Sequence, residues 1–208
     1  MGNPAPVSVK GRRFPPEVLT ADEVRALIRA ASGRAPTGVR NRAAIALLYR
    51  AGLRISEALD LYPKDVDLAE GTVTLLMGKG KRRRVVGLDA GAVALIERWL
   101  DVRAKLGADR GWRPSTRRLI CTLEGGPVRP VYYRQVLPRL AARAGIEKRV
   151  HPHCLRHTHA YELANEGLPP HLIQAQLGHT SLATTDRYLR HIAPVELVRA
   201  ITAREWSL

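Results

Sequence analysis

The sequence is poor in cysteine and contains no long apolar run. Its two cysteines, Cys121 and Cys154, are too few for a disulfide framework or, by themselves, for a zinc site, which fits a reducing compartment. No stretch approaches the roughly 18 apolar residues of a membrane-spanning helix. Residues 1–10 also lack the apolar block of a secretory signal. We therefore expect a cytoplasmic protein without a membrane partner.

Acidic residues are scarce relative to basic ones. The 208 residues include 19 Asp and Glu but 34 Lys and Arg, so the formal net charge is +15. Such an excess of positive charge indicates a polyanionic partner. Because 45% of the residues are hydrophobic, the chain can form a packed core, and disorder is excluded as its main state. The length suits one domain, or at most two small ones.

Signatures of several enzyme classes are missing. No Gly-x-Gly-x-x-Gly, His-Glu-x-x-His or Gly-x-Ser-x-Gly motif occurs in the chain. Lys79 is followed by Gly80, where a phosphate-binding loop needs Ser or Thr to hold Mg²⁺. The sequence therefore lacks the chemistry of the usual ATPases, zinc proteases and esterases.

The first residues differ in composition from the rest. Residues 1–16 hold four prolines and three basic residues, Arg12 and Arg13 among them, and show no apolar periodicity. We predict a flexible basic arm over residues 1–16 and a single domain over residues 17–208.

Apolar spacing predicts that this domain is mainly helical. Thr20 and Glu23 form the pattern of a capping box that opens the first helix. A second helix, at about residues 39–50, carries apolar residues on its buried face and ends before Gly52. Further helices are expected at about residues 90–105, 131–144, 153–166, 170–177, 182–189 and 194–206.

One small β element is expected within the helical domain. The β-prone runs at residues 72–77 and 84–88 flank Gly-Lys-Gly-Lys, which predicts a hairpin with a basic tip. Residues 107–118 resemble a polar loop, and residues 119–122 are either a short strand or an extended connection. The fold class is thus α+β, a helical bundle with a small β-hairpin sheet.

Histidines gather in one short segment. His151, His153, His157 and His159 lie close in sequence, with Cys154 among them. One interpretation is a metal site, but no paired carboxylate or second thiol lies nearby to complete a tetrahedral set. The other is a group of ordinary surface or core histidines in a basic protein.

Four motifs, taken together and in order, resemble those of a known family. Residues 51–59 read A-G-L-R-I-S-E-A-L, residues 78–80 read G-K-G, residues 153–158 read H-C-L-R-H-T, and residues 177–179 read L-G-H before Tyr188. This series resembles the tyrosine recombinases, the integrase family of DNA strand-exchange enzymes. The resemblance extends from about residue 20 to residue 191 and implies the catalytic-domain fold of that family.

The resemblance implies a site-specific recombinase that cleaves and rejoins double-stranded DNA through a 3′-phosphotyrosyl intermediate. It implies no metal and no cofactor. The family's catalytic positions are two arginines that grip the scissile phosphate, a hairpin lysine, two histidines and a nucleophilic tyrosine. In that order they match Arg54 and Arg156, Lys79, His153 and His179, and Tyr188.

The residue types suit this chemistry. Cleavage concentrates negative charge on the non-bridging phosphate oxygens, where preorganised donors lower the barrier most. An arginine donates two bonds to such oxygens and stays protonated. A phenol with a pKa of about 10 becomes a competent nucleophile beside cations and a base. Lys79 can act as the general acid that protonates the leaving 5′-oxygen.

Basic residues outside the catalytic set are expected to contact DNA phosphates. Glu57 is expected to orient a neighbour such as Arg54 rather than act as a base. The expected DNA-binding residues are Arg12, Arg13, Lys81, Arg82, Arg83 and Arg84.

Two features depart from the family pattern. Members usually carry a helical DNA-clamping domain ahead of the catalytic one, whereas about twenty residues precede the first expected helix here. Gly87 stands where a proline commonly ends the hairpin motif.

We expect a monomer in solution and a homo-tetramer on paired DNA sites, with accessory proteins as further candidate partners.

Two alternative functions stay open at this point. One is a catalytically silent DNA-binding accessory protein of the same fold. The other is a DNA-relaxing enzyme like the type IB topoisomerases, which share the phosphotyrosine chemistry.

Overall fold

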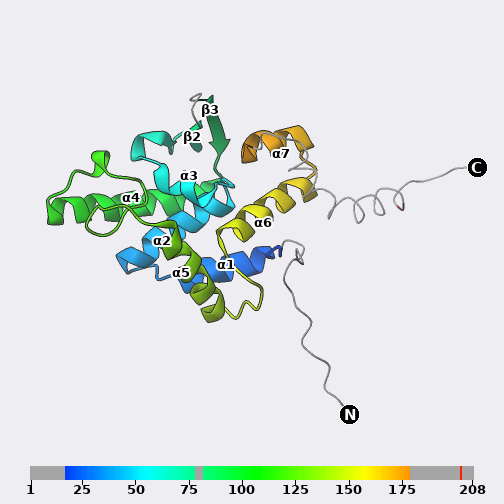
Figure 1. Ribbon diagram of the computed structural model, residues 1–208, viewed down its shortest axis with the longest axis horizontal. Helices are drawn as coiled ribbons and strands as arrows, with labels where there is room; N and C mark the ends of the chain where they lie inside the picture. Colours follow the sequence, from blue (N-terminus) through cyan, green and yellow to red (C-terminus); the bar gives the residue numbers. More distant parts are fainter. Residues whose placement is uncertain (1–16, 78–81, 179–201, 203–208) are drawn as a thin grey trace, which may run out of the picture.

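Helices form most of the structure, and three short strands form one antiparallel sheet in the order β1-β2-β3 (Figure 1). This computed structural model describes residues 17–77, 82–178 and 202. The predicted α+β class, mainly helical with a small β element, is confirmed. The helices are α1 (Ala21–Ala30), α2 (Pro36–Tyr49), α3 (Ile55–Asp60), α4 (Ala90–Arg110), α5 (Pro130–Arg143), α6 (Pro152–Asn165) and α7 (Pro170–Leu177), and the strands are β1 (Val66–Asp67), β2 (Thr72–Met77) and β3 (Arg82–Gly87).

Helix α2 lies at the centre of the core and packs against α4 and α6 (Figure 1). It begins three residues earlier than expected, with Pro36 in its first turn, where the missing N–H of proline costs no hydrogen bond. The apolar residues predicted to be buried are buried: Ala43, Ile45, Leu47 and Leu48. After the helix, Gly52 adopts φ +62°, which reverses the chain toward α3.

The start of α1 is capped as expected. The Glu23 amide donates to Thr20 Oγ1 at 3.1 Å, and the Thr20 amide donates to Glu23 Oε2 at 2.6 Å. Lys148 also donates to Glu23 at 2.7 Å, which ties the cap to the segment before α6. The capping box thus fixes both the first turn and its tertiary contact.

Helix α4 is longer than the sequence predicted. The expected polar loop at residues 107–118 is wrong in its first part, because the helix continues through Gly107 to Arg110 and ends at Gly111 with φ +70°. A Cβ at position 107 would lie 2.7 Å from the Trp112 carbonyl oxygen and 2.8 Å from Pro114. Close packing therefore outweighs the cost of about 1 kcal/mol for glycine inside a helix.

The predicted hairpin is present as β2 and β3, joined through residues 78–81. In its register Val73 lies opposite Val86, and Leu75 lies opposite Arg84. Strand β3 begins at Arg82, two residues earlier than expected. Residues 119–122 form no strand: Leu119 and Ile120 lie in a bend, and Cys121 makes an isolated bridge with Pro127.

The sequence did not predict four short elements: α3, β1 and the 3-10 helices η1 (Pro63–Asp65) and η2 (Pro114–Thr116). Helix α3 follows directly after Arg54, and β1 pairs with β2 through Val66 and Val73. At the other end, α6 and α7 pack together around Ala160, Ile173 and Leu177. No helix in the described part of the chain is both long and apolar enough to cross a membrane.

Candidate active site

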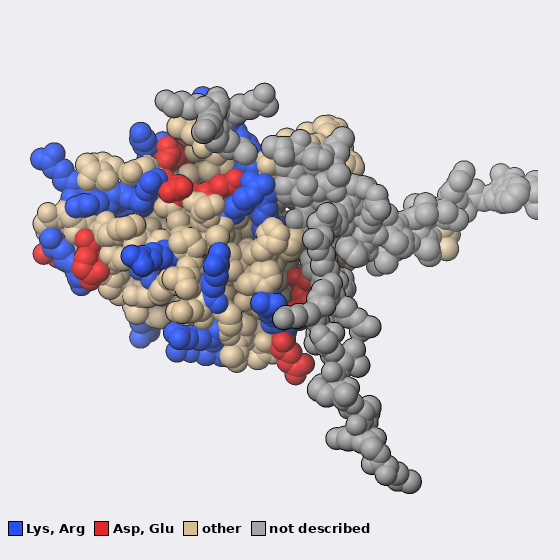
Figure 2. Space-filling view, viewed as in Figure 1, with Lys and Arg blue, Asp and Glu red and all other residues tan. Residues whose placement is uncertain are grey.

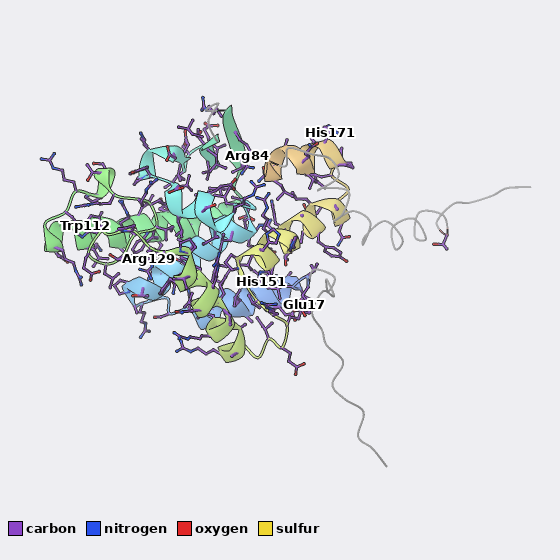
Figure 3. All side chains as sticks on the ribbon, in the orientation of Figure 1. Glu17, Arg84, Trp112, Arg129, His151 and His171 are labelled. Atoms are coloured by element: carbon purple, nitrogen blue, oxygen red, sulfur yellow. The ribbon has the colours of Figure 1, made fainter. Side chains whose placement is uncertain are left out.

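A cavity of about 590 Å³ opens between the start of α3, helix α5 and the start of α6. Arg54, His153 and Arg156 line it, so three of the six residues predicted for catalysis meet at one place. The other three, namely Lys79, His179 and Tyr188, lie outside the described residues. Figure 3 labels His151, which lines the same cavity at the start of α6.

Arg54 is the N-cap residue of α3, and its side chain is 41% exposed. Its amide donates to Glu57 Oε2 at 2.8 Å, and its Nη1 donates to Glu57 Oε1 at 2.8 Å. Its Nη2 donates to the Gly178 carbonyl oxygen at 3.4 Å. Glu57 therefore orients Arg54, as expected, through both the backbone and the guanidinium.

Arg156 is fully enclosed, with 1% of its surface exposed. Its Nη1 donates to the Gly52 carbonyl oxygen at 2.5 Å, and its Nη2 donates to the Leu177 carbonyl oxygen at 2.6 Å. These carbonyls follow α2 and end α7. The guanidinium of Arg156 thus joins three helices at the wall of the cavity.

Glu57 is the acidic centre of an arginine cluster. Its Oε2 lies 3.2 Å from Arg84 Nη2 and 3.8 Å from Arg156 Nη1, in addition to the Arg54 contacts. Burial by itself would raise the pKa of Glu57, but the Arg54 amide and the charges of Arg84 and Arg54 outweigh it, so this pKa is lowered. Glu57 is therefore ionised at neutral pH, and three guanidinium groups share one carboxylate.

The basic run of the hairpin divides between two environments. Arg84 points inward between β3 and α7, with 9% of its side chain exposed (Figure 3). Arg83 is exposed, and its Nη2 donates to Thr74 Oγ1 at 3.4 Å. Of the expected DNA-binding residues, the structure describes the side chains of these two, and it places only Arg83 at the surface.

His153 is open to solvent at the cavity, and its ring centroid lies 4.0 Å from that of His157. Partial desolvation and the positive charges of Arg156, His151 and Arg54 lower the pKa of His153. The imidazole is therefore neutral at neutral pH. Within the described ranges, no three His, Cys, Asp or Glu side chains are grouped so that they could hold a metal ion.

The cavity is also lined by three basic side chains that the sequence did not predict to be part of the site. Arg134 comes from α5, while Arg149 and His151 precede α6. The clustering of histidines marked His151, but no motif marked Arg134 or Arg149. With arginines on several sides and a neutral imidazole beside them, the cavity can hold an anionic group such as a phosphodiester.

His159 does not face this cavity and gives the protein a pH-dependent stability. It is 4% exposed, packs against Gly52 and Leu177, and neither ring nitrogen has a hydrogen-bond partner among the described residues. Burial, followed by the charges of Arg50 and Arg156 and opposed by Asp89, lowers the pKa of His159 to about 4.

We expect His159 to destabilise the fold as the pH falls from 6.5 to about 4. In this window the unfolded chain binds the proton and the folded protein does not, so roughly 3 kcal/mol of unfolding free energy is lost. His159→Leu should remove this loss, which urea titrations at pH 7.5, 5.5 and 4.5 would measure. Equal pH dependence in both proteins would show that His159 is not the responsible group.

Comparison with known proteins gives consistent matches over this fold and site. The model of the phage integrase family matches residues 17–193. Tyrosine recombinase XerC of Thermodesulfovibrio yellowstonii is 34% identical over 93% of this chain and 66% of its own length. Tyrosine recombinase XerD of Ralstonia nicotianae is 37% identical over 86% of this chain and 56% of its own length.

Solved structures agree with the sequence matches. The crystal structure of XerA recombinase has a TM-score of 0.78 and 28% identity, and the match covers 94% of this chain and 68% of that one. XerH recombinase bound to its palindromic difH substrate has a TM-score of 0.74 and 29% identity over 91% of this chain and 54% of that one. The expected fold is confirmed, and the chain spans less than two thirds of the two curated relatives. From its motifs, its fold and these matches, the chain is a member of the phage integrase family.

Proposed function

We propose that this protein is a tyrosine-type site-specific DNA recombinase that cleaves and rejoins strands through a 3′-phosphotyrosyl intermediate. The observation that carries the proposal is the convergence of Arg54, Arg156 and His153 on one cavity. The names of the relatives, which are tyrosine recombinases, support the same reaction. No described feature favours a silent accessory protein or a topoisomerase-like enzyme.

In the proposed reaction Arg54 and Arg156 hold the non-bridging oxygens of the scissile phosphate. The Tyr188 oxygen bonds to phosphorus and gives up its proton, and we propose neutral His153 as the base that accepts it. The bond from phosphorus to the 5′-oxygen breaks, and Lys79 protonates that oxygen. Attack by a 5′-hydroxyl of a second strand then reverses these steps and frees the tyrosine.

Double-stranded DNA is the partner that the charge distribution favours. Lys and Arg are spread over much of the face shown in Figure 2, while Asp and Glu occur there in fewer places. A substrate-bound relative, the XerH complex, has the same fold. We propose that Arg83 and the surrounding basic surface contact phosphates, together with Arg12, Arg13, Lys81 and Arg82.

We likewise propose residues 1–16 as a basic arm on a single catalytic domain over residues 17–208.

Covalent capture tests the proposed function without a known target site. The protein is incubated with a randomised pool of nicked duplexes, denatured with detergent, and recovered with any DNA linked to it. Sequencing of the recovered strands should give one recurrent site with protein at its 3′-phosphate, and strand exchange between two copies should follow. Absence of any detergent-resistant adduct would overturn the proposal, and relaxation without exchange would favour a topoisomerase-like enzyme.

Lys79→Ala should slow cleavage of ordinary DNA at least tenfold more than cleavage of DNA whose leaving 5′-oxygen is replaced by sulfur. The reason is that a thiolate leaves without a proton, so a missing general acid matters less. Single-turnover rates on the two substrates give this ratio. Equal slowing on both substrates would exclude Lys79 as the general acid.

The chain after Tyr188 carries apolar residues at helical spacing, and we propose that it couples subunits on DNA. Deleting residues 194–208 should leave a monomeric, DNA-binding protein that loses assembly on paired sites and most strand exchange. Mobility shifts with one-site and two-site duplexes would measure this loss. If the deletion instead unfolds the protein in a thermal melt, the segment belongs to its own core.

A further inference from the structure

Arg84 is a largely buried arginine next to the candidate active site, and the proposed reaction assigns no role to it. It comes from β3, its side chain is 9% exposed, and its Nη2 lies 3.2 Å from Glu57 Oε2. Its Nε and Nη1 are buried and have no hydrogen-bond partner in the described part of the chain. A surface residue that only screens DNA phosphates would not be enclosed in this way.

The backbone next to Arg84 leaves room for its guanidinium. A Cβ built at Gly178 would overlap Arg84 Nη1, so the arginine occupies the space of a side chain at the end of α7. The Gly178 carbonyl oxygen also accepts the bond from Arg54. Arg84 therefore lies against the same residue as Arg54, immediately before His179 in the chain.

A second contact holds β3 in the position that Arg84 needs. The Gln176 side chain pairs with the backbone of Gly87: Nε2 donates to the Gly87 carbonyl oxygen, and Oε1 accepts from the Gly87 amide, both at 3.3 Å. Members of the family commonly have a proline at this position, and a proline has no amide hydrogen to donate. The bond from the Gly87 amide therefore requires a residue other than proline at this position. Together the two bonds with Gln176 connect β3 to α7.

We propose that Arg84 is a positioning residue of the active site, which acts through Glu57 on Arg54 and Arg156. Arg84 shares Glu57 Oε2 with the Arg54 amide, so the Arg54 guanidinium is bound by Oε1 alone. Without Arg84, Oε2 keeps the Arg54 amide as its donor at 2.8 Å but loses its guanidinium partner at 3.2 Å, so it can accept a bond from the Arg54 guanidinium as well. Arg54 would then turn toward Glu57 and away from the phosphate.

Charge supports the same role. Arg54, Arg84, Arg156 and Glu57 together carry a formal charge of +2. A phosphodiester carries one negative charge and gains a second as the fifth oxygen bonds to phosphorus. With Arg84 removed, the four-residue cluster would carry only +1 and would match the transition state less well than the ground state.

The inference rests on the proposed function, and the experiment separates the two. A nicked duplex carrying the recovered site is prepared with an ordinary 5′-oxygen and with sulfur in its place. Arg84→Met should slow single-turnover cleavage of both substrates about a hundredfold. DNA affinity should stay within threefold, because the change acts on the transition state. Arg84→Lys, which keeps the charge, should recover about tenfold of the lost rate.

Two controls separate positioning from folding. Arg110→Met removes an arginine from a solvent-exposed ion pair, with Glu124 at 2.7 Å, on the end of α4 away from the cavity, and should cleave like the wild type. In a Glu57→Gln background, Arg84→Met should slow cleavage by less than threefold, because its route to Arg54 is already broken. The melting temperatures of Arg84→Lys and the wild type should agree. The cleavage rates of these two proteins then compare two folded states.

The outcomes are distinguishable. If the wild type cleaves and Arg84→Met is equally fast, the role of Arg84 is overturned while the proposed function stands. Slowing that sulfur rescues would also overturn it, because Arg84 would then act through Lys79 and the leaving oxygen. A full hundredfold loss in the Glu57→Gln background would contradict the route through Glu57. A wild type that forms no adduct overturns the proposed function and the role that rests on it.

Discussion

Tyr188→Phe should abolish the covalent protein–DNA adduct while DNA affinity stays within a few-fold of the wild type. The phenolic oxygen is the atom that bonds to phosphorus in the proposed reaction, and phenylalanine has no nucleophile to replace it. It contributes little to affinity, because phosphate contacts by Lys and Arg dominate DNA binding. Detergent-resistant adducts on gels and mobility shifts on the same duplex measure the two effects.

Tyr161→Phe is the matched control for this loss. Tyr161 is an exposed tyrosine on α6, and its removal should leave adduct formation unchanged. Addition of EDTA should also leave wild-type cleavage unchanged, because arginines supply the charge in this mechanism. An adduct in Tyr188→Phe, or cleavage that stops on chelation, would contradict the mechanism.

Arg156→Ala should reduce cleavage by about a thousandfold or more and should also destabilise the fold by about 3 kcal/mol. The loss of rate follows from its place at the candidate phosphate site. The loss of stability follows because the Gly52 and Leu177 carbonyl oxygens lose their buried donor, and a cavity is left between three helices. Single-turnover cleavage and urea unfolding would measure the two losses on one preparation.

Arg54→Ala separates these two effects. Its side chain is 41% exposed, and its bonds are to Glu57 and to one carbonyl at 3.4 Å. We expect a comparable loss of cleavage with less than about 1 kcal/mol of destabilisation. If both variants unfold at the same urea concentration as the wild type, the structural role of Arg156 is wrong.

Local sequence determined the elements whose signals are complete within a few residues. The capping box at Thr20 and Glu23 forms as predicted, because its donors and acceptors are three residues apart. The apolar residues expected to be buried in α2 are buried, although the helix is enclosed on nearly all sides, and residues 170–177 form α7 with the predicted ends. The order of the motifs also predicted the family, since each motif is read along the chain.

Tertiary packing decided what local patterns leave ambiguous. The run Arg82–Gly87 contains three arginines and two valines without alternation, so its inner face cannot be predicted from period-2 spacing. Pairing with β2 places Arg84 opposite buried Leu75 and therefore inside. In the same way, α4 continues through Gly107, where Trp112 and Pro114 pack so closely that no Cβ would fit, although local sequence predicted a loop there.

The candidate site shows this division most clearly. The motifs, through their resemblance to the family, predicted that Arg54, His153 and Arg156 act together, and the structure brings all three to one cavity. The sequence did not indicate that Arg156 binds the ends of two other helices, or that Glu57 is shared among three arginines. Those contacts join residues up to 104 positions apart. Their geometry depends on how helices and sheet pack, which no local spacing specifies.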